Sequence, residues 1–313
     1  MSDFTIRPIV AADKPAILDI ASRTWDGGDY LPWVFDDWLA DTDGEFVAAL
    51  LDGRVAGCGK LTFLTPRDAW LEGLRKHPDV THGGLAEAVT RYFLRRLAGR
   101  PGLDTVRFST YVANERSIAV NERLGFVRRR VFSCKAWSAK RGELASLACP
   151  SAGQARVAHD PAEAIGFLEA SPWLAATGGL LCEGWRAYPY APDWFAARYV
   201  ATGRCLGVVD SGRLAGLAAF SQDARFPRTY LKLAFIDAAT PEAADALFDW
   251  LFRYAKDHVS DENEIELILP PGVRIAPWAA ARGFESWERE DDFLVYELPL
   301  PLLAGFARGG TEP

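Results

Sequence analysis

The chain is poor in the residues that build disulfide frameworks and metal clusters. Its 313 residues include five cysteines and four histidines, and no two cysteines form a Cys-x-x-Cys pair. An odd, widely spaced set argues against both a disulfide framework and a zinc site, and it favours a reducing compartment. We therefore expect no bound metal. The cysteines are Cys58, Cys134, Cys149, Cys182 and Cys205.

Long apolar runs and an excess of positive charge are also lacking. No segment approaches the roughly 18 uninterrupted apolar residues of a membrane helix. Residues 1–14 carry charge where a secretory signal needs an apolar centre. These features predict a cytoplasmic protein without a membrane partner. The net charge of −7 disfavours nucleic acid as a partner and suits a small or cationic substrate better.

What the chain does have is an ordinary globular composition, 49% hydrophobic and 25% charged, in a length that suits two domains. In the first half, strand-like alternation and helical spacing of apolar residues follow one another. The patterns predict strands at 4–8, 69–76, 102–111 and 126–137, a hairpin at 45–64 that turns at Asp52 and Gly53, and helices at 11–25, from Leu85 and at 113–126.

The second half repeats the order of the first. The pattern around Arg54 returns around Arg213, an offset of 159 residues, and the pattern around Gly125 returns around Gly283, an offset of 158. A nearly constant offset across two separated matches indicates duplication of a whole unit. The stretch 217–271 has no glycine. The second copy has therefore kept its core pattern without the glycine-rich turn of the first.

That turn, Thr-His-Gly-Gly-Leu-Ala at residues 81–86, is the most informative stretch of the chain. A short turn that exposes consecutive backbone amides at a helix N-terminus is an anion site, because unpaired N–H groups and the helix dipole both point at it. A glycine turn that only caps a helix is the plainer alternative. The elements around the turn favour a phosphate group as its ligand.

With its neighbours, the turn resembles the fingerprint of the GCN5-related N-acetyltransferases (GNAT). The family pattern is a strand ending near a proline, a loop (Arg/Gln)-x-x-Gly-x-(Gly/Ala) opening a helix, a strand, and an Asn-led helix ending in Leu-Gly-Phe. Here these elements read LRKHPD, THGGLA, VRFSTY and NERSIAVNERLGF. The resemblance implies an α/β (α+β) acyl-CoA N-acyltransferase fold. This is a mixed, mostly antiparallel twisted sheet flanked by helices, in two tandem copies with a degenerate second one.

The resemblance also implies acetyl-CoA as co-substrate. The amides of residues 82–86 would hold its pyrophosphate, and Gly84 and Ala86 would leave room for it. Main-chain groups of Leu74 and Lys76 would meet the acetyl carbonyl and the pantetheine, serving as an oxyanion hole. The implied acetyl-CoA-binding residues are Leu74, Lys76, Thr81, His82, Gly83, Gly84, Leu85, Ala86 and Asn114.

Two positions depart from the family pattern. Thr81 stands where the loop usually begins with Arg or Gln, so one donor is missing. Asn121 stands where many relatives place a tyrosine that protonates the departing thiolate. An amide cannot supply that proton. Either the thiolate leaves unprotonated, which a thiol pKa of about 8.5 tolerates, or Ser117 or water supplies the proton.

The remaining candidates serve the acceptor amine. Glu72 lies mid-strand, just before the implied acetyl site, and is the candidate base or amine-orienting residue; a solvated strand residue is the alternative. Residues 26–45 carry seven acidic residues and no lysine or arginine. In the implied fold this segment walls the acceptor site, and an acidic wall would attract a cationic amine. Asp26, Asp29 and Tyr30 are the candidate acceptor contacts.

These observations together predict an acetyl-CoA-dependent N-acetyltransferase that acts on a small amine, such as an amino acid, by direct acyl transfer. A non-catalytic CoA-binding sensor or scaffold is one alternative, and a tandem aminoacyl transferase is another. Ser117 and Asn121 join Glu72 as catalytic candidates, and a homodimer is possible. The predicted division is a catalytic domain at 1–140, a linker at 141–156, a degenerate copy at 157–300 and a tail at 301–313.

Overall fold

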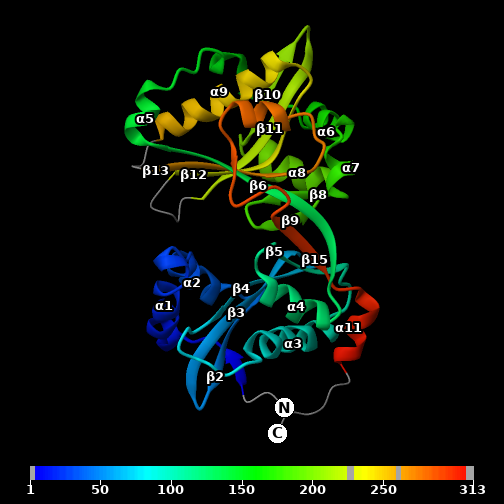
Figure 1. Cartoon of the computed structure of the whole chain (residues 1–313). Helices are drawn as coiled ribbons and strands as arrows, with labels where there is room; N and C mark the ends of the chain where they lie inside the picture. Colours follow the sequence, from blue (N-terminus) through cyan, green and yellow to red (C-terminus); the bar gives the residue numbers. More distant parts are fainter. Residues whose placement is uncertain (1–3, 224–228, 259–261, 308–313) are drawn as a thin grey trace. The chain divides into compact units, whose positions relative to one another are not determined.

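The computed structural model describes residues 4–223, 229–258 and 262–307 (Figure 1). The chain divides into two compact units. The first comprises Met1–Arg129 together with Val295–Pro313, and the second comprises Arg130–Leu294. Each unit is built on a twisted, mostly antiparallel sheet flanked by helices.

The sheet of the first unit runs in the order β1-β2-β3-β4-β5 and is antiparallel except for the parallel pair β4–β5. Helix α3 covers one face, where added Cβ atoms on Gly57 and Gly59 would meet its side chains; α2 covers the other, where Trp38 lies against Gly73. The strands are β1 (Thr5–Pro8), β2 (Glu45–Leu51), β3 (Arg54–Thr65), β4 (Asp68–Lys76) and β5 (Thr105–Tyr111). The helices are α1 (Lys14–Ser22), α2 (Leu31–Ala40), α3 (Leu85–Ala98) and α4 (Glu115–Arg123), with short η1 (Ala11–Asp13) and η2 (Trp25–Gly27).

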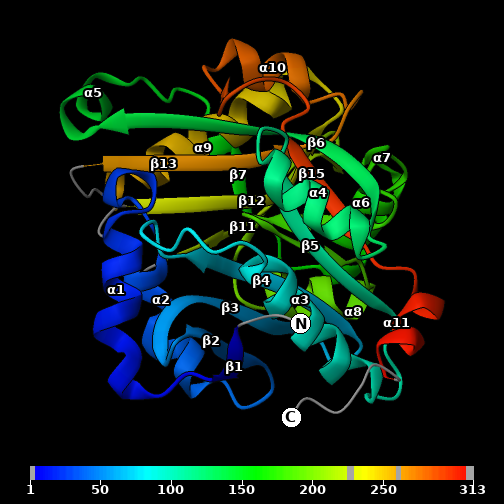
Figure 2. The same cartoon turned by 60° about the horizontal axis from the view of Figure 1, so that its bottom comes forward.

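The end of the chain completes the first unit. Strand β15 (Phe293–Glu297) lies next to β5, and helix α11 (Leu300–Phe306) lies beside α3 in Figures 1 and 2. Tyr296 is buried and stacks on Phe108 at 5.2 Å between ring centroids. Burial and the hydrogen bond to Glu122 raise the pKa of Tyr296 to about 12, so the phenol stays protonated and donates at neutral pH.

The second unit repeats this plan with an additional hairpin. Its sheet runs β7-β10-β11-β12-β13-β6, with β12 and β13 parallel and β14 paired to β6. Its strands are β6 (Val127–Lys140), β7 (Ala155–Val157), β10 (Cys205–Asp210), β11 (Arg213–Gln222), β12 (Thr229–Ala238), β13 (Glu262–Leu269) and β14 (Glu285–Ser286), and the separate hairpin is β8 (Leu180–Glu183) with β9 (Arg186–Pro189). Its helices are α5 (Arg141–Ser146), η3 (Ala152–Gln154), α6 (Pro161–Ala170), α7 (Trp173–Thr177), α8 (Pro192–Phe195), η4 (Ala196–Val200), α9 (Pro241–Asp257) and α10 (Ala276–Ala281).

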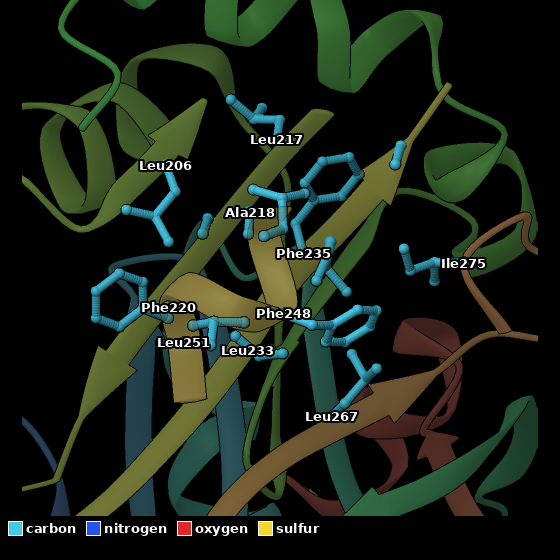
Figure 3. Packing of buried hydrophobic residues seen from close by; sticks show 14 of the residues in the cluster. Leu206, Leu217, Ala218, Phe220, Leu233, Phe235, Phe248, Leu251, Leu267 and Ile275 are labelled. Atoms are coloured by element: carbon cyan, nitrogen blue, oxygen red, sulfur yellow. The ribbon is translucent and has the colours of Figure 1, made fainter. Parts of the chain in front are cut away.

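The core of the second unit forms between α9 and the sheet. Helix α9 points Phe248 and Leu251 at the strand residues Phe220, Leu233 and Leu267, and all five are buried (Figure 3). The helical spacing of apolar residues in α9 places them on one face, which the sheet covers. This burial supplies the main apolar contribution to the stability of the unit.

The hairpin at the start of each sheet confirms the internal repeat. Strands β2 and β3 turn at Asp52 and Gly53, and strands β10 and β11 turn at Ser211 and Gly212, all four with positive φ. Paired positive φ angles at the two central residues define the hairpin turn that fits the strand twist. Both hairpins also shift register, with the extra residue, Ala56 or Ala215, on the strand after the turn.

The domain boundaries differ from those predicted. Residues 141–156 were expected to be a linker, but they form α5, η3 and the start of β7 within the second unit. The predicted tail at 301–313 contains most of α11 of the first unit, and residues 308–313 lie outside the described residues. The cause is a strand exchange: β6, which follows α4, pairs with β13, and the first unit takes its last strand from 295–297.

Candidate functional site

The N-terminus of α3 presents backbone amides without a side-chain cap. Gly84 is its N-cap residue, with φ of 89°, and makes no side-chain hydrogen bond to the helix. The turn at 81–84 is exposed, and a Cβ added to Gly83 or Gly84 would meet nothing within 4 Å. The first amides of a helix have no intrahelical acceptor. They are therefore available to an anion, as the sequence predicts for the pyrophosphate of acetyl-CoA.

The matching helix of the second unit is capped. Thr240 accepts a hydrogen bond from the amide of Ala243 at 3.2 Å, and Pro241 occupies the first turn. The cap occupies one amide, and proline has none to offer. Beyond the parallel pair β12–β13, an ion pair of 2.5 Å between Asp237 and Arg274 bridges the strand ends. Within the described part of the second unit, α9 thus offers no counterpart to the open helix terminus of α3.

Strand β4 is distorted beside this helix terminus. Its pairing with β3 shifts register between Cys58 and Lys60, which places an extra residue, a bulge, at Gly73 and Leu74. Gly73 has φ of 65°. The parallel pairing of β4 with β5 covers only Asp68–Trp70. Bulges re-aim main-chain groups and end strand pairing. The two strands therefore part at the segment where the sequence predicts the acetyl and pantetheine contacts.

Among those predicted contacts, Leu74 is half-buried and Lys76 is exposed. The carbonyl of Leu74 accepts a hydrogen bond of 2.9 Å from the side chain of Arg75. On the turn, Thr81 and His82 are exposed, and the His82 ring packs edge-on against Phe4 with 5.3 Å between centroids. His82 is thus held in place beside the helix terminus.

Glu72 lies on the α2 face of β4, just before the bulge. Its Oε1 accepts a hydrogen bond from the hydroxyl of Thr62 at 2.6 Å, and its cross-strand neighbour is Lys60. Lys60 is fully buried and bonds to Asp41 and to the carbonyl of Leu61. Glu72 is half-buried and held in position, as a base or amine-orienting residue requires.

The start of α4 orders the other catalytic candidates. Asn114 caps the helix, accepting a hydrogen bond from the amide of Ser117 at 3.3 Å. The buried Asn121 donates to the Ser117 carbonyl at 2.9 Å and to its hydroxyl at 3.4 Å. The amide of Asn121 is thus engaged within its own helix and contacts the Ser117 hydroxyl.

The predicted acceptor contacts separate in the structure. Asp29 is fully buried and pairs with Arg75 at 2.5 and 3.3 Å, and it also accepts from the amide of Leu31. Burial opposes the charge of Arg75, but the neighbouring Tyr30 and Asp29 raise the pKa of its guanidinium above the ordinary value. Asp29 is therefore engaged by Arg75 and buried, whereas Asp26 is exposed.

Four of the seven acidic residues in the segment form ion pairs with cations from elsewhere in the chain. Besides Asp29, Asp36 pairs with Lys14 at 2.7 Å, Asp41 with the buried Lys60, and Glu45 with Arg96 at 3.1 Å. The composition of the segment predicts an acidic wall. Because cationic partners from other elements offset part of its charge, the segment is less negative than its sequence suggests.

Sequence reasoning missed Arg75 and Trp25. The Arg75 guanidinium lies 4.3 Å from the centre of the Trp25 ring, which is 54% exposed. For Arg75 a signal was available, because it is an arginine next to the implied acetyl site, on a strand whose side chains alternate between the two faces. Nothing local to Trp25 signalled that its ring would cover an ion pair made by residues 29 and 75.

Comparison with known proteins identifies the first unit. The sequence model of the acetyltransferase (GNAT) family matches residues 14–126. The first unit belongs to the GNAT family. This match runs from the start of α1 to the end of the α4 region and includes the glycine-rich turn, the β4 bulge and Glu72. None of the curated proteins compared with the chain matches it in sequence.

Solved structures extend the likeness to the whole chain. A GCN5-related N-acetyltransferase from Sphaerobacter thermophilus superposes with a TM-score of 0.63 at 16% identity, over 96% of each chain. A tandem GNAT protein from the clavulanic acid biosynthesis pathway superposes with a TM-score of 0.60 at 16% identity, over 99% of this chain and 100% of that one. At such identities the likeness establishes the fold, which is two tandem GNAT copies.

Two further observations concern the described residues alone. No helix within 4–223, 229–258 and 262–307 is both long and apolar enough to cross a membrane. Over the same ranges, no three residues among His, Cys, Asp and Glu are grouped so that they could hold a metal ion.

Proposed function

We propose that the first GNAT unit binds acetyl-CoA and transfers its acetyl group directly to the nitrogen of a small amine. The observation that carries this proposal is the uncapped α3 terminus at Gly84, next to the place where β4 parts from β5. Family membership of residues 14–126 supports the acetyltransferase activity. The second unit, with its capped α9, would support the first without a site of its own.

The residues would divide the work as follows. The amides at the start of α3 would hold the pyrophosphate, and the bulge at Leu74 would direct a main-chain donor at the carbonyl oxygen. Acetyl-CoA, when bound, supplies the acetyl carbonyl as the electrophile. Glu72 would take a proton from the amine, directly or through water. The Ser117 hydroxyl, which accepts a hydrogen bond from Asn121, would donate a hydrogen bond to the departing thiolate, and the thiolate would take its proton from water.

The experiment is thiol release from acetyl-CoA across amino acids, monoamines, polyamines and aminoglycosides, with calorimetric CoA binding in parallel. Turnover with one class would establish the enzyme. Binding without turnover would favour the non-catalytic CoA-binding alternative. Absence of CoA binding would exclude both the acetyltransferase and the non-catalytic CoA-binding alternative, and it would leave the tandem aminoacyl transferase.

Substitution of Glu72 tests the assigned base. Glu72→Gln keeps the shape of the side chain and its contact with Thr62, but it cannot accept a proton. We expect a loss of about a hundredfold in kcat with unchanged affinity for acetyl-CoA. Thr62→Val is the matched control, because it removes the hydrogen bond and leaves the carboxylate. Unchanged turnover in Glu72→Gln would mean that the base lies elsewhere.

A further inference from the structure

Trp25 is a large aromatic residue held out on the surface of the first unit. Its side chain is 54% exposed, although it follows helix α1 by only a short turn. One face of its ring lies over the guanidinium of Arg75, 4.3 Å from the centroid. Arg75 is itself fixed by the buried Asp29. One face of the ring therefore packs on a fixed ion pair, and the other face is available to a ligand.

The backbone that holds this ring is strained. Trp25, Asp26 and Gly27 have consecutive positive φ angles of 49°, 54° and 85°. The left-handed conformation costs an ordinary L-residue roughly 1–2 kcal/mol, and two non-glycine residues adopt it here in succession. Glycine occupies only the third position. Strain of this kind persists where the surrounding structure enforces it, and such places cluster at ligand sites.

The ring lies close to the predicted acetyl site. Arg75, on which it rests, directly follows Leu74 at the bulge and donates a hydrogen bond of 2.9 Å to the Leu74 carbonyl. A molecule that reaches the opening between β4 and β5 from the α2 face therefore passes beside Trp25. Loops on a rigid scaffold commonly select the ligands of such openings.

The cation already under the ring favours an apolar ligand group over a cationic one. Of the aspartates in this segment, Asp29 pairs with Arg75, Asp36 with Lys14 and Asp41 with Lys60, whereas Asp26 is exposed. The electron-rich ring already faces one cation. A second cation on the opposite face would lie across the ring from the first, whereas an aromatic or aliphatic group meets no such opposition.

We propose that Trp25 determines acceptor specificity by packing against an aromatic or aliphatic group of the acceptor. The acceptor would then be a monoamine that carries such a group, and polyamines would be poor substrates. This inference rests on the proposed acetyltransferase function and names the acceptor class for it.

The test compares 2-phenylethylamine with spermidine as acceptors for the full-length chain. We expect 2-phenylethylamine to be preferred in the wild type. Trp25→Gly removes the ring and also relieves the strained φ, so it should fold; we expect its kcat/KM for 2-phenylethylamine to fall about ten- to a hundredfold, mainly through KM. Trp25→Phe should restore most of that loss. The affinity for acetyl-CoA and the thermal midpoint should change little in either variant.

The outcomes separate the two proposals. Preference for spermidine, or an unchanged acceptor ratio in Trp25→Gly, would overturn the role of Trp25 and leave the acetyltransferase standing. A loss of thermal stability without a change in KM would mean that Trp25 only shields the Arg75–Asp29 pair, which also overturns the inference. If no amine caused thiol release from acetyl-CoA, the proposed acetyltransferase function, on which this inference rests, would be overturned.

Discussion

Gly84 is the residue on which the proposed acetyl-CoA binding depends most directly. It begins α3 with φ of 89° and leaves the amides of the first turn uncovered. Valine there would be strained and would project a branched side chain into the space at the helix terminus. We expect Gly84→Val to weaken acetyl-CoA binding by at least about tenfold, measured by calorimetry.

Gly53 offers a matched control for that substitution. It also has positive φ, 76°, and open space around its α-carbon, but it lies in the turn between β2 and β3. Gly53→Val should reproduce the loss of stability without the loss of affinity. Equal affinities of the two variants for acetyl-CoA would count against the α3 terminus as the pyrophosphate site.

Asp41 ties the acidic segment to the pH dependence of stability. Burial alone would raise its pKa, but the hydrogen bond from Lys60 and those from backbone amides hold the pKa below the ordinary value of 3.8. A carboxyl with a depressed pKa binds more protons when unfolded, so its contribution is complete above the unfolded pKa and is lost as pH falls through the folded one. We expect urea midpoints of the wild type to drop below about pH 4, and those of Asp41→Asn to drop less over that range.

The comparison variant is Asp36→Asn. It removes a carboxylate of the same segment whose side chain is 74% exposed. Its pH dependence should follow the wild type, because exposed pairs contribute little to stability. If both variants flatten the curve equally, the effect belongs to net charge and not to the Lys60–Asp41 pair.

At this scale the sequence predicts residues whose role is local and fails where partners are distant. Gly84 and Asn114 were placed at helix starts by short-range pattern, and both stand there. Asp29 was expected to face the acceptor. Its actual partner, Arg75, is 46 positions away, and only the fold brings them together. The catalytic and binding roles themselves remain predictions.

Among the elements, strand β15 and helix α11 complete the first unit from the end of the chain. Tyr296 fills a buried site against Phe108 and donates to Glu122 at 2.9 Å. We expect Tyr296→Ala to lower the unfolding free energy by about 3 kcal/mol and to weaken acetyl-CoA binding, while Tyr296→Phe costs about 1 kcal/mol. Denaturant unfolding measures the unfolding free energies, and calorimetry measures the affinity for acetyl-CoA.

Loss of stability in Tyr296→Ala with full acetyl-CoA affinity would show that β15 is not needed to hold the site. Phe293→Ala provides a reference, because Phe293 is equally buried but belongs to the second unit. It should destabilise the chain and leave the affinity for acetyl-CoA unchanged.

Most elements of the first unit follow the periodicity of the sequence, and the exceptions have physical causes. The hairpin turning at Asp52 and Gly53 and the helix from Leu85 lie where predicted. Strand exchange could not be predicted, since a strand's apolar pattern specifies that it pairs but not with which partner. The hairpin β8–β9 also escaped prediction, because its short strands are set in a segment rich in aromatic residues and proline.

For the whole molecule, the contrast between α3 and α9 predicts the stoichiometry of binding. One unit has an open glycine terminus and the other a threonine cap followed by proline. We expect one acetyl-CoA per chain by calorimetry, and none after Gly84→Val. A second equivalent that survives Gly84→Val would assign a site to the second unit. Thr240→Ala should cost about 1 kcal/mol of stability without creating an acetyl-CoA site in the second unit.

The exchanged strand also governs when the first unit can be finished during synthesis. A chain leaves the ribosome from its N-terminus, and domains commonly fold in that order. Here the segment from Val295 to Phe306 emerges after the second unit, yet it belongs to the unit whose other elements emerge before the second unit. The nascent first unit must therefore wait, incomplete, while the whole second unit is made. A chain cut short within the second unit would yield an unfinished first unit, so the proposed acetyl-CoA site depends on synthesis of the chain through Phe306.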